Sequence, residues 1–401
     1  MRIAMISEHA SPLAALGGVD AGGQNAHVAE LAAALAAQGH EIRVYTRRDS
    51  HDLPEVMPLS DGIDLVHVPA GPPEALPKDE LLPFMGTFAE WMARDWQRGW
   101  RPDVAHAHFW MSGLATVTAG RTCDVPVVQT YHALGAVKRR HQGPADTSPL
   151  HRIAYERELG RAVDRVIVQC EDERGELLRL GVPRNRMTLV PSGVNTERFS
   201  PEGPVAPRES GRARILTVAR LVERKGIEDL IRALPGVPGA DLVVAGGPPA
   251  AGLADDPYAG KLRRLAAELR ISDRVRLLGA VPADEMPAWY RSAEVVAATP
   301  WYEPFGLSPL EAMACGVPVV ASAVGGLTDT VVDGVTGDLV PPRDPRSLSV
   351  ALRHLLGDDM RRVAYRAAAV DRAAYAYSWP RIAARLGEVY ESLAVTTAAV
   401  A

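Results

Sequence analysis

Two glutamates flank a loop in the segment "PWYEPFGLSPLEAMACG" (residues 300–316), and this arrangement suits the recognition of hydroxyl groups. Glu303 lies in a stretch rich in proline, glycine and aromatic residues, whereas Glu311 lies where an apolar helix is expected. Carboxylates only accept hydrogen bonds, so they match sugar and ribose hydroxyls. Between them, the backbone amides of Phe305, Gly306 and Leu307 precede a helix start, where a diphosphate binds well. A nucleotide sugar would use all of these groups.

A purely structural role for Glu311 stays open at this point. Ser308, Pro309 and Glu311 have the spacing of a helix N-cap, a first-turn proline and the acidic residue of a capping box. On that interpretation Glu311 would satisfy the backbone amide of Ser308, and Gly316 would end a short helix. It leaves Glu303 and the glycine-containing loop unexplained.

A second glycine-rich loop follows the first predicted strand. It reads "GGVDAGGQN" (residues 17–25) and leads into a helix expected from about Gln24 to just before Gly39. The backbone amides, with Gly22 and Gly23 nearest the helix, are predicted to cradle a phosphate; a plain flexible turn is the alternative. The glycine spacing differs from the dinucleotide-binding pattern, which disfavours a dehydrogenase.

The elements that must position these loops alternate between short β-branched runs and longer amphipathic stretches, as in parallel α/β sheets. The chain of 401 residues is long enough for two domains. The stretch "SPEGPVAPRESGRA" (residues 200–213) lacks apolar periodicity and is predicted to be the linker. Predicted strands lie within residues 3–7, 41–46, 64–68, 103–108, 125–130, 165–169 and 187–190, and then within 214–220, 241–247, 274–281, 294–300, 318–326 and 337–342.

Composition excludes several classes of protein. The formal net charge of −5 argues against nucleic acid as a partner, and no stretch is apolar enough for a membrane span. The three cysteines form no C-x-x-C pair, so neither a disulfide framework nor a zinc site is indicated, and we expect a cytoplasmic protein.

Several motifs in order along the chain resemble the retaining nucleotide-sugar glycosyltransferases of family 4. They are the two glutamates of residues 303–311, "VARLVERKGIEDLIRAL" (218–234), "VPSGVNTERF" (190–199) and "GGLTDTVVDGVTGDLVPPRD" (325–344). The resemblance implies an α/β protein of two Rossmann-like domains in the GT-B arrangement, with the active site in the interdomain cleft. The expected domains are an acceptor-binding domain, residues 1–205, and a donor-binding domain, residues 206–376. A terminal helix over residues 377–393 would pack back on the first domain.

The same resemblance implies a donor site for a nucleotide-diphosphate sugar, most commonly a UDP-sugar. Arg220 and Lys225 would hold the diphosphate, so that no metal and no other cofactor is required. A solvated charged turn is the alternative for these two cations. Glu311 would bind the ribose, and the backbone from Gly279 to Val281 would meet the base.

His132, just after a predicted strand in "QTYHALGAVKRR" (residues 129–140), would lie beside the reaction centre. Without the resemblance, a lone histidine is more often structural. Glu303 would stabilise the transferred sugar rather than act as a firm nucleophile, because the leaving phosphate is thought to accept the proton in retaining members of the family.

The acceptor site would lie in the first domain, at Asn25, Lys78 and Arg152. Residues 17–28 and 71–84 resemble the sucrose-phosphate synthases and the N-acetylglucosaminyltransferases of mycothiol biosynthesis, which act on phosphorylated sugars or cyclitols. A lysine and an arginine suit a phosphate group. Phe109 and Ala133 replace two hydroxyl-bearing residues of the mycothiol enzymes, which leaves room for an unphosphorylated acceptor.

Two other classes of function stay open. One is a different sugar-nucleotide enzyme, such as a 2-epimerase or a phosphorylase, and the other is a non-catalytic sugar-nucleotide binder. The amphipathic last helix, with Ile382, Leu386, Val389 and Leu393 on one face, would serve equally in a homodimer interface.

Overall fold

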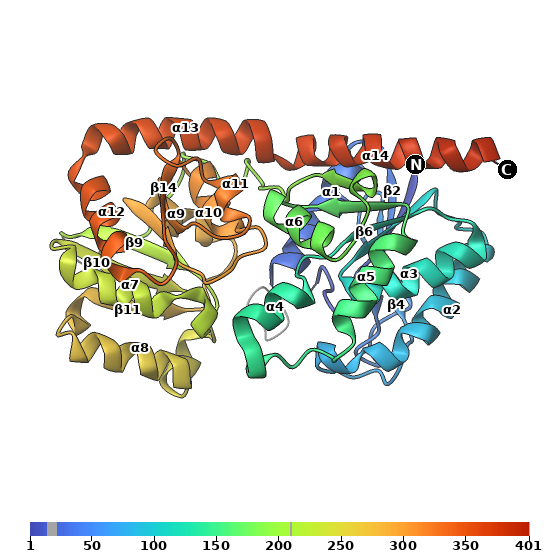
Figure 1. Cartoon of the computed structure of the whole chain (residues 1–401), viewed down its shortest axis with the longest axis horizontal. Coiled ribbons are helices and arrows are strands. Elements are labelled where there is room, and N and C mark those ends of the chain that lie inside the picture. The colour runs from blue at the N-terminus through green and yellow to red at the C-terminus, as the bar shows by residue number, and fades with distance from the viewer. Residues whose placement is uncertain (14–21, 209–210, 401) are drawn as a thin grey trace. The chain divides into compact units, whose positions relative to one another are not determined.

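The computed structural model describes residues 1–13, 22–208 and 211–400. The chain forms two compact units (Figure 1). Unit 1 comprises Met1–Gly193 with Trp379–Ala401, and unit 2 comprises Val194–Ser378. In the described part of the chain, no helix is both long and apolar enough to cross a membrane.

Unit 1 is built on an eight-stranded sheet in the order β3-β4-β2-β1-β5-β6-β7-β8. Its strands are β1 (Arg2–Ile6), β2 (Glu41–Arg47), β3 (Val56–Ser60), β4 (Ile63–Val68), β5 (Val104–His108), β6 (Val127–Thr130), β7 (Arg165–Val168) and β8 (Met187–Leu189). All neighbours pair in parallel except β3, which runs antiparallel to β4. The predicted strands of this half are confirmed. β3 was not predicted, because its sequence VMPLS contains a proline, which only an edge strand tolerates.

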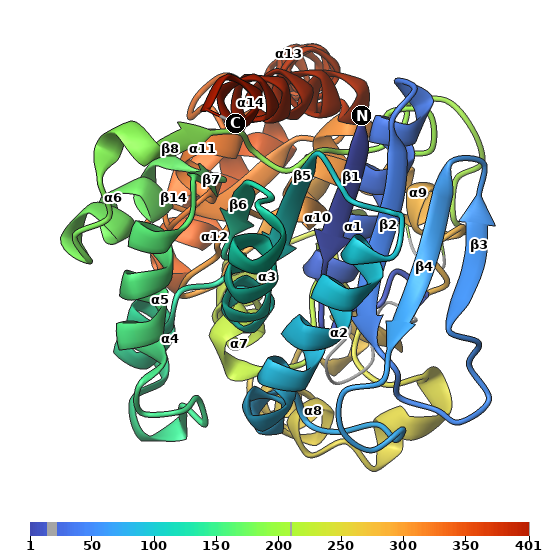
Figure 2. The same cartoon turned by 90° about the vertical axis from the view of Figure 1, so that its right-hand side faces the viewer.

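Helices cover both faces of this sheet, so its strands are buried on both sides. Ile3 and Met5 of β1 pack with α1 (Gly23–Ala37) and α14 (Trp379–Val400), whereas Ala4 and Ile6 pack with α2 (Met85–Gln97) and α3 (Trp110–Cys123). Figure 2 shows α2 and α3 on the near face of the sheet. The remaining elements are α4 (Gly135–Gln142), α5 (Arg152–Ala162), α6 (Glu171–Arg179), η1 (Lys78–Glu80), η2 (Leu82–Phe84), η3 (Gly143–Ala145) and η4 (Arg184–Arg186).

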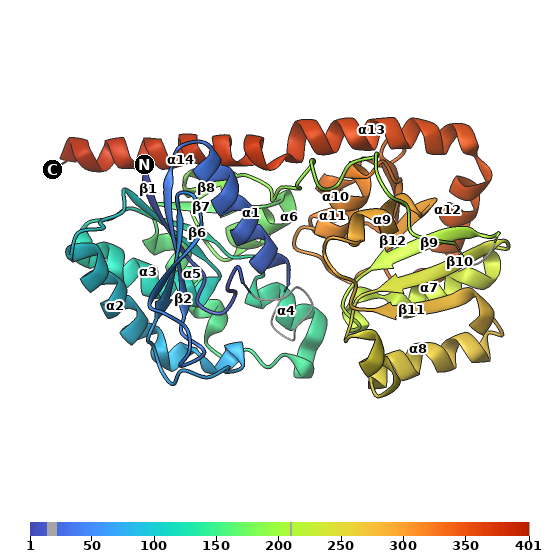
Figure 3. The same ribbon diagram turned by 180° about the vertical axis from the view of Figure 1, so that it is seen from behind.

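Unit 2 contains a six-stranded parallel sheet in the order β11-β10-β9-β12-β13-β14. The strands are β9 (Ala213–Val218), β10 (Ala240–Ala245), β11 (Val275–Gly279), β12 (Val295–Ala298), β13 (Val319–Ser322) and β14 (Gly337–Val340), and each confirms a predicted strand. Successive residues along a strand again point to opposite faces of the sheet, where they join two separate hydrophobic cores. Ile215 packs toward α7 (Ile227–Ala233), α8 (Pro257–Glu268) and α12 (Pro345–Gly357). Its neighbour Leu216 packs toward α9 (Met286–Arg291), α10 (Leu307–Ala314), α11 (Leu327–Thr330) and α13 (Asp359–Tyr377). Figure 3 labels these helices around the strands of unit 2.

Short 3-10 turns are η5 (Glu223–Lys225), η6 (Leu234–Gly236), η7 (Ala250–Ala254) and η8 (Ser272–Arg274).

The boundary between the units lies before Val194, not near residue 205 as predicted. Val194 donates its backbone N–H to the carbonyl of Tyr377 at 2.8 Å, and both Val194 and Phe199 are buried in the core of unit 2. The proline-rich stretch that follows is therefore part of unit 2, since Ala206 also bonds to the backbone of Ala288 at 3.0 Å. The last helix, α14, packs against α1 within unit 1.

Candidate active site

The carboxyl edge of the unit 2 sheet brings together Lys225 and Glu303, which the sequence placed in one site. Lys225 ends η5, just after β9, and Glu303 lies in the loop between β12 and α10. The ammonium group donates to Glu303 Oε2 at 2.5 Å, with 19% and 17% of the two side chains exposed. Arg220 follows β9 and acts electrostatically on both groups. The carboxyl end of a parallel sheet is where such folds bind ligands.

Charge at this edge is unbalanced. Burial alone would raise the pKa of Glu303, but the positive charges of Lys225, Arg224 and Arg220 outweigh it and the pKa is lowered. The pKa of Lys225 is lowered too, first by burial and then by repulsion from Arg224 and Arg220, in spite of the attraction of Glu303. Three cations, Lys225, Arg224 and Arg220, thus act on the one carboxylate of Glu303, and this local excess of positive charge suits an anionic ligand.

Glu311 lies on α10, whose start differs from the prediction. The helix begins at Leu307 with Gly306 as its N-cap, so Ser308 is already helical and cannot be the capping residue. Gly306 has a φ of 96°, and a Cβ there would lie 2.4 Å from the side chain of Leu327. This left-handed glycine starts the helix earlier than the Ser-Pro pattern suggested.

The carboxylate of Glu311 is held by a tyrosine. Tyr290, on α9, is fully buried and donates its hydroxyl to Glu311 Oε2 at 2.7 Å. Burial first, and then the Glu311 charge, raise the pKa of Tyr290 well above its usual range, so the phenol stays protonated. Glu311 is therefore an oriented acceptor on the first turns of α10.

The other predicted donor residues lie at or near the same edge. Gly279 ends β11 with a φ of 77°, and a Cβ there would lie 2.7 Å from the carbonyl of Pro248, so only glycine fits. Val281 is half-buried against the core of unit 2. Phe305 is buried in that core, so its backbone, and not its ring, is available to a ligand.

In unit 1, His132 lies just beyond β6 in the backbone conformation that glycine favours, with a φ of 60°. A tight turn supports it, since Ala133 donates its N–H to the carbonyl of Tyr131 at 2.7 Å. His132 Nε2 lies 2.9 Å from Nδ1 of His108, which ends β5. Burial, followed by repulsion from other histidines including His27, holds the pKa of His132 well below its usual range. His132 is therefore neutral.

Arg152 does not stand open to an acceptor as predicted. Only 2% of the residue is exposed, and its guanidinium donates to Glu156 at 2.7 Å, to Ser148 at 3.1 Å and to the carbonyl of Ala133 at 2.7 Å. Glu156 in turn accepts from the N–H of Gly135 at 2.9 Å. Arg152 thus fastens the loop after His132 to α5, which is a positioning role.

Asn25 has a similar role. It is 2% exposed, accepts from the N–H of Gly22 at 3.0 Å and donates to the carbonyl of Ser11 at 2.8 Å, so its amide is occupied in shaping the start of α1. Direct acceptor binding by Asn25 stays a prediction, and within the described residues its amide serves the helix start. Gly22 and Gly23 open α1 as expected, whereas the preceding residues 17–21 of the glycine-rich loop lie outside the described residues.

Lys78 is half-buried at the start of η1. Its neighbour Asp79 accepts from the hydroxyl of Thr147 at 2.6 Å, which fastens η1 to the segment that leads into α5. The role of Lys78 in binding a phosphate stays a prediction.

Three functional candidates escaped the sequence-based predictions. Tyr290 and His108 sit within apolar runs that indicate only core positions, and no local pattern marks their partners. His9 lies in the loop after β1. Its Nδ1 lies 2.8 Å from the buried carboxylate of Glu8, and its ring packs 4.8 Å from that of Phe109.

Histidines also gather in unit 1. Within the described residues, His27, His108 and His132 each offer a ligand atom, and these atoms lie within 4.8 Å of one another. His27 and His108 are buried and their pKa values are lowered, to about 3 for His27, mainly by burial.

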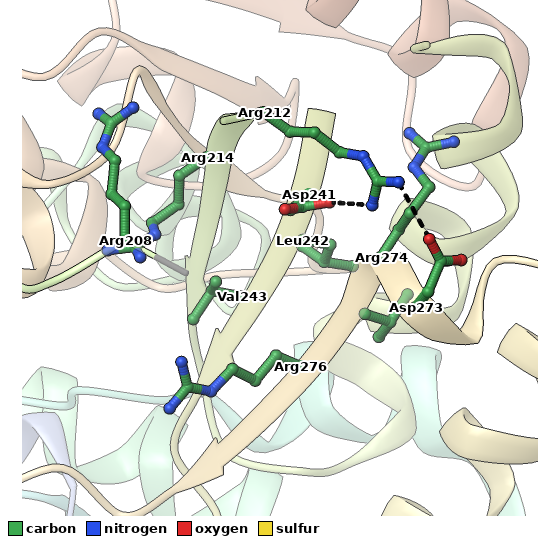
Figure 4. Close-up of a pocket in the computed structure, with 10 residues that line it drawn as sticks. Arg208, Arg212, Arg214, Asp241, Leu242, Val243, Asp273, Arg274 and Arg276 are labelled. Atoms are coloured by element: carbon green, nitrogen blue, oxygen red, sulfur yellow. Dashed lines mark hydrogen bonds and ion pairs between the residues drawn. The ribbon is translucent and has the colours of Figure 1, made fainter. Parts of the chain in front are cut away.

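Unit 2 has a cavity of about 200 Å³ at the amino ends of its strands, away from the candidate site (Figure 4). Arginines line it, but the protein itself satisfies them. Arg212 pairs with Asp241 and Asp273 at 3.1 Å each, Arg274 donates to three backbone carbonyls, and Arg214 donates to the Ser292 hydroxyl. This is an ion-pair network that joins strands rather than a substrate site.

Comparison with known proteins agrees with this architecture. The family model "Glycosyltransferase Family 4" matches residues 21–198, and "Glycosyl transferases group 1" matches residues 203–372. A D-inositol 3-phosphate glycosyltransferase of Xylanimonas cellulosilytica is 38% identical over 407 residues, covering 97% of this chain and 96% of the relative. The enzyme of the same name from Kineococcus radiotolerans is 38% identical over 422 residues, covering 97% and 94%.

Among solved structures, sucrose-phosphate synthase from Thermosynechococcus elongatus superposes with a TM-score of 0.88 at 31% identity, covering 98% of this chain and 99% of the synthase. Anabaena HepE, solved with UDP and glucose, shares the fold with a TM-score of 0.74 at 19% identity, covering 98% of this chain and 100% of HepE. This chain belongs to the family 4 glycosyltransferases, and it is a glycosyltransferase enzyme made of two parallel-sheet α/β units.

Proposed function

We propose that this glycosyltransferase transfers a hexose or N-acetylhexosamine from a UDP-sugar to a small hydroxylated acceptor, with retention of configuration at the anomeric carbon. The observation that supports this most is the excess positive charge at the carboxyl edge of unit 2, beside two carboxylates that have separate partners. A nucleotide-diphosphate sugar supplies both the missing negative charge and the hydroxyl groups.

The donor would use the residues of that edge as follows. Arg220 and Lys225 bind the diphosphate, and the N–H groups at the start of α10 add neutral donors. Glu311, oriented by Tyr290, accepts hydrogen bonds from the ribose hydroxyls. The backbone from Gly279 to Val281 meets the base. Uracil is the first base to test, because HepE, which shares the fold, was solved with UDP.

The transfer step would proceed through an oxocarbenium-like sugar, with the acceptor entering on the face from which the diphosphate leaves. The leaving diphosphate accepts the proton of the acceptor hydroxyl, and Arg220 and Lys225 stabilise the charge that develops on it. Glu303 stabilises the positive charge on the sugar, and His132 binds the sugar. No protein nucleophile is required in this proposal.

The acceptor class to test first is a cyclitol or sugar phosphate, because the 38% identical relatives are D-inositol 3-phosphate glycosyltransferases. Lys78 is the cation proposed to meet the acceptor phosphate. Arg152 acts indirectly, through the loop that carries His132. Phe109 and Ala133 offer no side-chain hydroxyl, so phosphate affinity should be weaker than a site with two more donors would give.

We also propose that transfer needs no metal, because cationic side chains take the place that a divalent ion would fill at the diphosphate. The matching experiment measures transfer after treatment with a chelator and after addition of Mg²⁺ or Zn²⁺. Unchanged activity with chelator is expected. A requirement for metal would contradict the proposal and direct attention to the cluster of His27, His108 and His132.

The test of the proposed function begins with thermal unfolding in the presence of UDP, GDP, ADP or TDP and their sugar conjugates. A ligand that binds only the folded state, at about one hundred times its dissociation constant, adds about 2.7 kcal/mol of stability. The stabilising donor is then incubated with inositol phosphates, sugar phosphates and the free polyols, and NMR of the product gives the anomeric configuration. Release of sugar-1-phosphate that depends on phosphate instead of acceptor would indicate a phosphorylase, and binding without turnover would indicate a sensor.

A further inference from the structure

The hydrogen bond between His108 and His132 constrains which nitrogen of each ring carries the proton. Two ring nitrogens, Nδ1 of His108 and Nε2 of His132, lie too close together for two lone pairs to face each other. A neutral imidazole has one N–H and one lone pair. One of the two nitrogens that lie 2.9 Å apart, Nδ1 of His108 or Nε2 of His132, must therefore donate to the other.

The second nitrogen of His108 decides between the two directions. His108 is fully buried, and its Nε2 has no hydrogen-bond partner among the described residues. If His132 were the donor, the proton of His108 would sit on Nε2 as a buried N–H with nothing to accept it. Orphaned buried N–H groups are rare, because each has lost its hydrogen bond to water without a replacement. If His108 donates from Nδ1, only a lone pair is left without a partner.

The surroundings of the pair favour the same arrangement. The neighbouring His106 is occupied elsewhere, with Nδ1 2.6 Å from the Tyr390 hydroxyl and Nε2 2.8 Å from Thr130 Oγ1, and its ring packs 4.2 Å from that of His108. The centroids of the His108 and His132 rings lie 5.2 Å apart and the ring planes are 24° from parallel, so the rings meet edge to edge, as a hydrogen bond between ring nitrogens requires. The His108 ring is buried and packed against His106, which keeps its Nδ1 directed at His132.

We infer that His108 is a positioning residue that donates its Nδ1–H to Nε2 of His132 and thereby holds His132 as the tautomer protonated on Nδ1. His132 then offers a hydrogen-bond donor, and not a base, to a bound ligand. The catalytic consequence rests on the proposed function, in which His132 binds the sugar; the assignment of the tautomer does not. A donor at this point is consistent with a mechanism in which the leaving diphosphate accepts the proton.

The test uses the full chain labelled with ¹⁵N-histidine, and side-chain NMR correlations that distinguish a protonated Nδ1 from a protonated Nε2. The signals of His132 are assigned by their loss in His132→Gln. His108→Asn keeps an N–H donor near the position of Nδ1, whereas His108→Leu has no donor. His67→Asn is the matched control, since it removes a buried imidazole, bonded at 2.7 Å to the carbonyl of Pro54, from strand β4, which β2 and β1 separate from β5 in the same sheet.

We expect wild type, His108→Asn and the His67→Asn control to show His132 protonated on Nδ1, and His108→Leu to shift it toward Nε2. Transfer by His108→Leu should fall by roughly ten- to hundred-fold in kcat, a range typical of lost partners that orient a histidine, with UDP affinity unchanged. His108→Asn should recover most of that loss. Thermal unfolding of each variant separates folding defects from these effects.

Three results would overturn the inference: His132 protonated on Nε2 in wild type, an unchanged tautomer in folded His108→Leu, or a stoichiometric transition metal in the purified protein, because a metal bound by both nitrogens excludes the shared proton. A shifted tautomer with full kcat would instead leave His108 as the positioning residue and refute the role of His132 in transfer.

Discussion

Replacing Tyr290 by phenylalanine tests whether Glu311 is oriented for ligand binding. The change removes one hydroxyl, which donates to Glu311 Oε2 at 2.7 Å from a fully buried ring, and leaves the ring in place. The carboxylate would keep its position on α10 but lose the group that fixes its direction. Both stability and UDP affinity should therefore fall.

The expected size follows from the geometry. Hydrogen bonds to charged groups contribute about 1.5–3 kcal/mol, so Tyr290→Phe should cost unit 2 about 2 kcal/mol. For a domain of roughly 150–250 residues, 1 kcal/mol corresponds to about 2–4 °C, which predicts a drop of about 4–8 °C in Tm. Misorientation of Glu311 should weaken UDP binding by about ten-fold, which is equivalent to about 1.4 kcal/mol of binding free energy.

The assay is a double-mutant cycle of Tyr290→Phe and Glu311→Gln, with UDP affinity from calorimetry and Tm from thermal unfolding. Tyr45→Phe is the control, because Tyr45 is equally buried and donates to Asp95 at 2.8 Å in unit 1. It should lose stability without losing UDP affinity. Additive effects of the two site changes, or UDP affinity unchanged by Tyr290→Phe, would refute the orienting role.

Three further predictions concern the cations. The double variant Arg220→Ala, Lys225→Ala should bind UDP roughly 30-fold more weakly or worse, since losing one partner of a buried charge pair costs about 2–5 kcal/mol. Calorimetry that finds wild-type UDP affinity in the folded double variant would exclude this donor site. Because the pKa of Lys225 is lowered, the lysine loses its proton below the usual lysine range, and UDP affinity should fall as pH rises through that point. Lys225→Arg should keep its affinity to higher pH, and calorimetry across the alkaline range checks both. Lys78→Ala should raise KM only for phosphorylated acceptors, so an equal rise for the free polyol would contradict its role.

The fold could be predicted from the sequence because each strand of a two-sided parallel sheet is a short apolar run that needs no knowledge of its neighbours. The errors arose where position in the sheet or in the tertiary structure decides. β3 is an edge strand with a proline. Residues 200–213 have the composition of a linker, but Ala206 within them bonds to the backbone of Ala288 in unit 2. Linker composition describes a loop, not the unit to which the loop is attached.

The candidate site was predictable where function depends on the element that carries the residue, as for Lys225 and Glu303. It was not predictable where folding brings several possible hydrogen-bond partners near one polar side chain. Arg152 and Asn25 were expected to face an acceptor, yet backbone carbonyls and a buried carboxylate occupy them. Tyr290 carries no mark in the sequence of its bond to Glu311.

The partners of the two glutamates imply different behaviour when a donor binds. Glu311 bonds to a neutral phenol that no substrate group needs, so it can keep that bond while it accepts from a ribose. Glu303 instead shares Lys225, the same cation that the proposed function assigns to the diphosphate. A diphosphate must therefore compete for that cation and loosen its hold on the Glu303 carboxylate, at the stage when the donor sugar arrives. The ion pair with Lys225 would then make release of the Glu303 carboxylate depend on donor binding, whereas Glu311 would keep its partner Tyr290 throughout.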